Sequence, residues 1–132
     1  NVQEGTTLYV CIGEGCGAAL LHNREIVRGI HHSGVLLGHM VIDPSGPVCT
    51  CGKRGCLESL ASELGFIRGL WPEITKKPSE MTPGEREELV RRGVELLKSG
   101  EARAREAYRS VVEYLGIGLS NAADHCPLRA AA

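Results

Sequence analysis

Three cysteines are crowded into one short stretch of the sequence, at Cys49, Cys51 and Cys56. Thiolates are ligands that Zn²⁺ prefers, and a structural zinc site takes four ligands in a tetrahedron. His39, which lies ten residues before Cys49, is the candidate for the fourth ligand. With all four positions filled by protein atoms, no position is left for a substrate water molecule. The pattern therefore predicts one structural zinc ion.

The residues between the cysteines suit such a site. Gly52 and Gly55 let the backbone turn tightly enough for three sulfur atoms to converge. Lys53 and Arg54 are either partial counter-charges for the thiolates or solvated loop residues. The alternative is that the three cysteines are free or disulfide-bonded, which the compact spacing and the lack of a secretion signal disfavour. The other cysteines are expected to be plain thiols and the other histidines polar surface residues: Cys11, Cys16 and Cys126; His22, His31, His32 and His125.

The composition is that of an ordinary globular chain. It has 132 residues, 42% hydrophobic and 23% charged, which suffices for one domain or part of one. The formal net charge of −1 offers no basic face that would neutralise many phosphates, so this segment itself is not expected to bind nucleic acid. The sequence has no apolar run of the roughly 20 residues that span a bilayer and no secretion signal. We therefore expect a cytoplasmic location and no membrane partner.

Strands are expected before the cysteines. The segment 7–12 is an apolar, β-favouring run, glycines follow in 13–17, and 18–21 resumes the apolar pattern, which predicts two strands joined by a glycine turn. A polar turn centred on Asn23 predicts a hairpin to a third strand. A further strand is expected over 39–43.

Helices are expected after the cysteines. Apolar residues at helical spacing begin at Leu57, and a helix from Thr82 to about Lys98 is signalled by a threonine cap, a proline at the first position and a glutamate three residues after the cap. The prolines of 71–78 indicate a connecting loop. A last helix from about Glu101 to Asn121 carries one apolar stripe: Ala104, Ala107, Val111, Leu115 and Leu119.

The Gly38-His39 pair, followed by the C-x-C-G-x-x-G-C-x-E run of 49–58, resembles the signature of the ROK family of repressors and sugar kinases. The resemblance implies an α/β fold, part of an actin-like (ribonuclease-H-like) structure of two lobes with sugar bound between them. It also implies that Glu58 and His39 contact the sugar. The glycine turn resembles the family's nucleotide-phosphate loop in degenerate form: Gly13, Gly15 and Gly17.

The resemblance further implies that residues 1–132 form a partial ROK domain. Strands and the glycine loop occupy 1–48, the zinc knuckle 49–58 and the helical part 59–132, while the N-terminal lobe and the final strand are expected to be absent. Two positions depart from the family pattern. Leu36 stands where a sugar-binding glutamate is usual, and Glu14 places a carboxylate between two glycines, where ATP phosphates would approach. The exposed edges of such a truncated sheet suggest a homodimer.

Three functions remain open. The first is the effector-binding and dimerisation part of a sugar-sensing transcriptional regulator, which binds a sugar or sugar phosphate and reaches DNA only through segments outside this chain. The second is a fragment of an ATP-dependent sugar kinase of the glucokinase or N-acetylhexosamine kinase type, whose catalytic base lies elsewhere. The third is a zinc-stabilised relic that binds no ligand. Glu14 and Leu36 favour the first.

Overall fold

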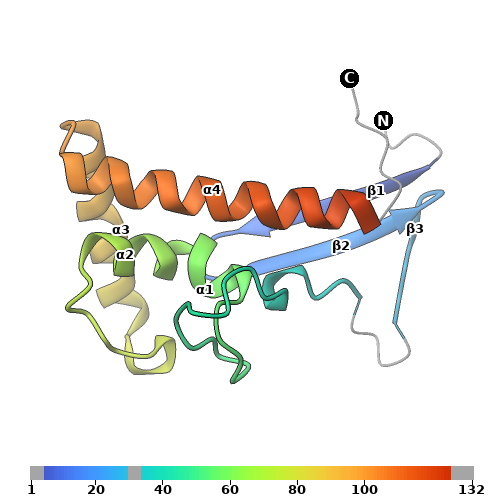
Figure 1. Cartoon of the computed structure of the whole chain (residues 1–132), viewed down its shortest axis with the longest axis horizontal. Helices are drawn as coiled ribbons and strands as arrows, with labels where there is room; N and C mark the ends of the chain where they lie inside the picture. Colours follow the sequence, from blue (N-terminus) through green and yellow to red (C-terminus); the bar gives the residue numbers. More distant parts are fainter. Residues whose placement is uncertain (1–4, 30–33, 126–132) are drawn as a thin grey trace.

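The computed structural model describes residues 5–29 and 34–125 and shows a small antiparallel sheet covered on one face by helices (Figure 1). The sheet contains β1 (Thr6–Ile12), β2 (Cys16–His22) and the short β3 (Glu25–Ile26), in the order β1-β2-β3. Thr6 pairs with His22 and Ile12 with Cys16, so the glycine turn closes the first hairpin. Asn23 and Arg24 have positive φ angles and form the second turn, as the polar residues there predicted.

The covered face of the sheet follows from the alternation along β1. Leu8 and Val10 pack toward the helices, whereas Tyr9 lies on the opposite face and is 52% exposed. The buried side chains that meet Leu8 and Val10 come from β2, from the short 3₁₀ helix η1 (Leu37–His39), from α1 (Leu57–Ala61) and from α4 (Ala102–His125). Figure 1 shows α4 running along the hairpin, with α1 and α2 (Glu63–Leu70) beneath it.

The helices were largely predicted. Helix α3 (Pro83–Lys98) starts at the Thr82 capping box, in which the Glu85 amide donates to the Thr82 hydroxyl and the Glu85 carboxylate accepts from the Thr82 amide. It ends before Gly100, whose φ of +85° is unfavourable for other residues. The segment 71–77 is irregular, as expected, and leads into a second 3₁₀ turn, η2 (Pro78–Glu80).

The helical run that begins at Leu57 is interrupted. Ser62 has an extended backbone and separates α1 from α2. Because of this break, the first amide of α2, that of Glu63, is free to donate to the Gly13 carbonyl oxygen at 2.9 Å. The glycine turn is therefore tied by a backbone hydrogen bond to the start of α2.

Two expectations about secondary structure were wrong. The segment 39–43 is not a strand, because η1 ends at His39 and only an isolated bridge joins Val41 to Cys56. The amides of Ile42 and Asp43 both donate to the Gly55 carbonyl, so the chain curls instead of continuing a ladder. The last helix was expected to end at about Asn121 but extends to His125, and Leu119 of its apolar stripe is 37% exposed.

Several residues named above lie outside the described part of the chain: His31, His32 and Cys126. The same holds for the side chain of His125 and for the segment after it. None of the helices in the described ranges has the length and apolar character needed to cross a bilayer.

Candidate metal centre

The segment from His39 to Cys56, which we call the metal loop, brings the four predicted ligands together. The donor atoms of His39, Cys49, Cys51 and Cys56 all lie within 4.8 Å of one another. Cys49 and Cys56 are buried, and Cys51 is exposed. The prediction that His39 joins the three cysteines is confirmed as geometry.

Two of the separations between the donor atoms match those around a tetrahedral metal ion. Zinc lies about 2.3 Å from sulfur and 2.0–2.1 Å from an imidazole nitrogen, which places two tetrahedral sulfur atoms about 3.8 Å apart and a sulfur and a nitrogen about 3.5 Å apart. The Cys51 and Cys56 sulfur atoms are 3.7 Å apart. The Cys49 sulfur is 3.6 Å from Nδ1 of His39. A disulfide is excluded at these separations because its sulfur atoms would be about 2 Å apart.

The backbone of the metal loop explains why these donors converge. The Cys49 amide donates to the Lys53 carbonyl and the Gly52 amide to the Cys49 carbonyl, which forms a tight turn around Cys51. Gly52 and Gly55 have φ angles of +88° and +65°. A Cβ on Gly55 would overlap the Asp43 carbonyl oxygen, whereas a Cβ on Gly52 would meet nothing within 4 Å. Gly55 is therefore required for two reasons, its φ angle and its close contact.

The thiols differ in acidity before any metal binds. Burial raises the pKa of Cys56 to about 12, and the neighbouring sulfur atoms of Cys51 and Cys49 add to this shift. The Lys53 backbone amide, followed by the neighbouring thiols, lowers the pKa of Cys51. The Lys53 ammonium group donates to the His39 carbonyl oxygen at 3.0 Å, so it lies beside the donors as a counter-charge would. Cys51 therefore ionises before Cys56.

Glu58 connects the metal loop to the glycine turn. One carboxylate oxygen accepts a hydrogen bond from the Cys16 amide at 3.2 Å, and the other accepts one from the Thr50 hydroxyl at 3.1 Å. A Cβ on Gly15 would lie 2.9 Å from this carboxylate, so a glycine lets the turn approach it. The carboxylate also helps to raise the pKa of Cys16, after the effect of burial. The structure thus places Glu58 beside both the metal loop and the glycine turn.

The glycine turn carries an ion pair that the sequence did not reveal. Glu14 at the tip of the turn pairs with Arg86 of α3 at 2.7 Å, and Glu63 of α2 lies 3.8 Å from the same guanidinium. The Arg86 side chain is only 12% exposed, whereas Glu14 is 70% exposed. Gly17 lies away from this tip, in β2. Leu36 precedes η1 and is 63% exposed.

Known proteins resemble this chain in sequence. The ROK family model matches residues 1–127. The xylose repressor of Bacillus subtilis (strain 168) is 32% identical over 114 residues, which is 86% of this chain and 27% of the repressor. The glucokinase of Thermotoga maritima is 41% identical over 59 residues, which is 45% of this chain and 19% of that enzyme. The chain therefore spans less than a third of the length of these curated relatives.

Solved structures share the fold. A ROK hexokinase from Thermus thermophilus superposes with a TM-score of 0.74 and 27% identity over 92% of this chain and 38% of that protein. A ROK family transcriptional regulator homologous to the Escherichia coli MLC protein superposes with a TM-score of 0.65 at 22% identity, over 92% of this chain and 31% of the regulator. The α/β fold expected from the sequence, part of the actin-like structure of these sugar kinases, is confirmed. The chain belongs to the ROK family.

Proposed function

We propose that this chain is the effector-binding and dimerisation part of a sugar-sensing transcriptional regulator. The extent of similarity supports a regulator: xylose repressors from Bacillus and Caldicellulosiruptor match 86–90% of the chain. The similarity to the Thermotoga glucokinase and to the N-acetylmannosamine kinase of Vibrio vulnificus covers 41–45% of it. In this proposal residues 1–132 are a partial ROK domain, and the DNA-binding segments lie in other parts of the protein.

The observation that carries the proposal is the Glu14–Arg86 pair at the glycine turn. A nucleotide phosphate approaching this turn would meet the Glu14 carboxylate, and like charges repel. Arg86, whose guanidinium lies at the tip, already has Glu14 as a carboxylate partner at 2.7 Å. The turn that contains Gly13 and Gly15 is therefore held to α3 without a phosphate, which suits a sensor better than an ATP-dependent enzyme.

A zinc ion would give the metal loop its rigidity. The four ligands His39, Cys49, Cys51 and Cys56 leave no open coordination position, so the ion would be structural. Beside it, Glu58 and His39 would contact the sugar or sugar-phosphate effector. The Glu58 carboxylate has about four lone-pair sites and accepts from the Cys16 amide, the Thr50 hydroxyl and the Cys49 thiol, so an acceptor site remains for a sugar hydroxyl.

The uncovered sheet supports the homodimer. Within the described ranges the outer edge of β1 pairs with no other strand. Such an edge offers unpaired amides and carbonyls, and native proteins cover or pair such edges. The apolar side chains of Tyr9 and Ile12 are exposed on β1. We propose that a second copy, or other segments of the same protein, covers this side.

The second candidate is part of an ATP-dependent sugar kinase. Two observations favour it: the TM-score of 0.74 with the Thermus thermophilus hexokinase and the 41% identity over 59 residues with the Thermotoga maritima glucokinase. In this case Glu58 would bind the sugar that is phosphorylated. Glu14 and the exposed Leu36 would then need another explanation.

An assay of the intact protein separates the two functions. We expect a regulator to show no sugar-dependent ADP formation with a panel of pentoses and hexoses, and to change its affinity for its own promoter DNA when one of them binds. Glu58→Gln should abolish the response to sugar while zinc content stays near one per chain, and the exposed Glu25→Gln serves as the control variant. Sugar-dependent ADP formation that Glu58→Gln abolishes would establish the kinase instead.

A further inference from the structure

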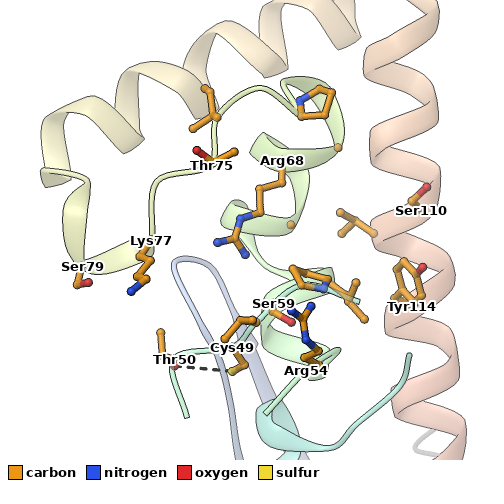
Figure 2. Close-up of a pocket in the computed structure, with 18 residues that line it drawn as sticks. Cys49, Thr50, Arg54, Ser59, Arg68, Thr75, Lys77, Ser79, Ser110 and Tyr114 are labelled. Carbon is orange, nitrogen blue, oxygen red and sulfur yellow. Dashed lines mark hydrogen bonds between the residues drawn. The ribbon is translucent and has the colours of Figure 1, made fainter. Parts of the chain in front are cut away.

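A cavity of about 1030 Å³ lies on the side of the metal loop where α2, the segment after α2 and α4 meet (Figure 2). The metal loop contributes Cys49 and Arg54, α2 contributes Arg68, and Ser110 and Tyr114 come from α4. The cavity is large enough for a small organic molecule. It lies beside the region of Glu58, and Glu58 itself does not line it.

The charged side chains that line this cavity are all basic. Its lining includes Arg54, Arg68 and Lys77 and contains no aspartate or glutamate. The whole chain has 16 acidic and 15 basic residues, so a positive excess here is not a general property of the sequence. Figure 2 shows the Arg68 guanidinium pointing into the middle of the cavity, with Lys77 on one side and Arg54 and Ser59 below. Three basic groups thus surround one space.

Among these three cations, Arg68 has a buried nitrogen atom that lacks a hydrogen-bond partner within residues 5–29 and 34–125. Its Nη1 atom is buried and forms no hydrogen bond to the described part of the chain, and no ion pair joins Arg68 to a carboxylate there. Burial lowers the pKa of this guanidinium, and the negative charge of the Cys49 thiolate opposes part of that shift. A buried polar atom without a hydrogen bond is costly, and arginine forms paired hydrogen bonds with carboxylate and phosphate oxygens.

Hydroxyl groups complete the lining. Thr75 and Ser79 lie on the segment that also bears Lys77, and Ser110 and Tyr114 line the α4 wall (Figure 2). Hydroxyls both donate and accept hydrogen bonds, so they could bind the polar, uncharged part of a ligand whose charged group binds the basic side chains. Ile74 and Val111 are among the residues that give the cavity its apolar surface.

We propose that this cavity binds the oxyanion of a small hydroxylated molecule, a phosphate monoester or a carboxylate, with Arg68 as the central contact. Lys77 and Arg54 would lie around the same oxyanion, and the hydroxyls of α4 would face the rest of the ligand molecule. The ligand would restore to the Arg68 Nη1 atom the hydrogen bond that it lacks. This inference does not rest on the regulator or kinase function, because it concerns a cavity next to the proposed sugar contacts.

The test is calorimetric titration of the intact, zinc-loaded protein with inorganic phosphate at constant ionic strength. We expect saturable binding that sodium chloride does not reproduce. Arg68→Gln should weaken it about tenfold or more, because a hydrogen bond to a charged group is lost. Lys77→Gln should weaken it about threefold, by removing one of the surrounding charges. The neighbouring Lys76→Gln is the matched control and should leave it unchanged, because Lys76 pairs with Glu85 outside this cavity.

Titrations with glycerol phosphate and with gluconate then distinguish the two sources of the oxyanion, since the preferred one should bind more tightly than inorganic phosphate. Zinc content and the unfolding midpoint are measured for every variant. Absence of saturable binding, or equal binding by Arg68→Gln, would overturn the proposal. So would loss of zinc from Arg68→Gln, since Arg68 would then serve as the counter-charge of the Cys49 thiolate, whose field it feels.

Discussion

Gly52 and Gly55 lie three residues apart in the metal loop and both have positive φ angles, yet their surroundings differ. Only Gly55 faces another part of the backbone, the carbonyl group of Asp43. The two positions therefore separate the cost of a left-handed backbone from the cost of a steric overlap. This distinction determines which single substitutions the metal loop tolerates.

Gly52→Ala should lower the free energy of unfolding by about 1 kcal/mol, the cost of placing a Cβ in the left-handed region. Gly55→Ala should cost clearly more and should release zinc faster to a chelator, because the Asp43 carbonyl must move and the loop with it. Denaturant unfolding and a colorimetric zinc-release assay would check both variants. Equal effects of the two substitutions would contradict the contact seen at Gly55.

The ligand set makes a second prediction at this scale. Cys51→Ser should reduce bound zinc from about one ion per chain to nearly none, since a serine hydroxyl does not replace a thiolate, and should destabilise the metal loop. Cys11→Ser is the matched control, because Cys11 is an exposed thiol on β1, outside the cluster. Metal analysis of the two purified variants decides the matter. Full zinc content in Cys51→Ser would show that Cys51 is not a ligand.

Helices α3 and α4 illustrate what single elements contribute. The start of α3 depends on a carboxylate that accepts from the Thr82 amide and hydroxyl and from Lys76. Along α4, two glycines a short distance apart differ in what they face. Gly118 is covered by Leu57 of α1, whereas nothing lies within 4 Å of a Cβ on Gly116.

The capping carboxylate predicts a pH dependence. The Thr82 amide, followed by Lys76, lowers the pKa of Glu85 from its ordinary value of 4.5 to about 2. Because the folded-state pKa is the lower one, the stabilisation is fully present above about pH 4.5 and is lost as the pH falls toward about 2. The unfolding midpoint of Glu85→Gln should therefore fall less steeply than that of the wild type between these pH values. Glu87→Gln, at an exposed position of the same helix, should keep the wild-type slope.

The glycines of α4 predict changes of opposite sign. Gly116→Ala should stabilise the protein by about 1 kcal/mol, since alanine has the higher helix propensity and meets no neighbour. In Gly118→Ala the new Cβ would lie 2.6 Å from the fully buried Leu57 side chain. Overpacking costs about 1–3 kcal/mol, so a net loss of about 1 kcal/mol is expected after the gain in propensity. Thermal unfolding of both variants would check the signs, and stabilisation by Gly118→Ala would contradict the packing of α4 on α1.

At the scale of the whole molecule, the Glu14–Arg86 pair joins the tip of the first hairpin to α3, across a large separation in sequence. The pair belongs to a set of ties around the glycine turn that also includes the Glu63 amide on Gly13 and the Glu58 carboxylate on Cys16. Sheet, metal loop and helices therefore meet at this turn.

A double-mutant cycle with Glu14→Gln and Arg86→Gln should give a coupling energy of about 0.5–1 kcal/mol at low salt, reduced at high salt. The exposure of Glu14 sets this limit, since water screens its charge. The exposed Glu88–Arg91 pair within α3 is the control and should couple by about 0.3–0.5 kcal/mol. A coupling energy of zero between Glu14 and Arg86 would remove the ion pair as a support for the regulator proposal.

The parts of this protein that the sequence by itself determined are those with local causes. The cysteine spacing identified a four-ligand cluster, the Thr82 box identified the start of α3, and the turn at Asn23 identified a hairpin, because each depends on residues close together in the chain. His39 was found because ligand chemistry requires a fourth donor. The family signature added the fold.

Tertiary structure alone decided the rest. The strand expected over 39–43 yielded to η1 and a curled chain because Gly55, distant in sequence, supplies the hydrogen-bond acceptor for Ile42 and Asp43. Arg86 and Arg68 look like ordinary helix-surface cations in the sequence, yet one pairs with the glycine turn and the other points into a cavity. The environments of these two arginines are formed by elements that meet only when the chain folds, so no local sequence pattern predicts them.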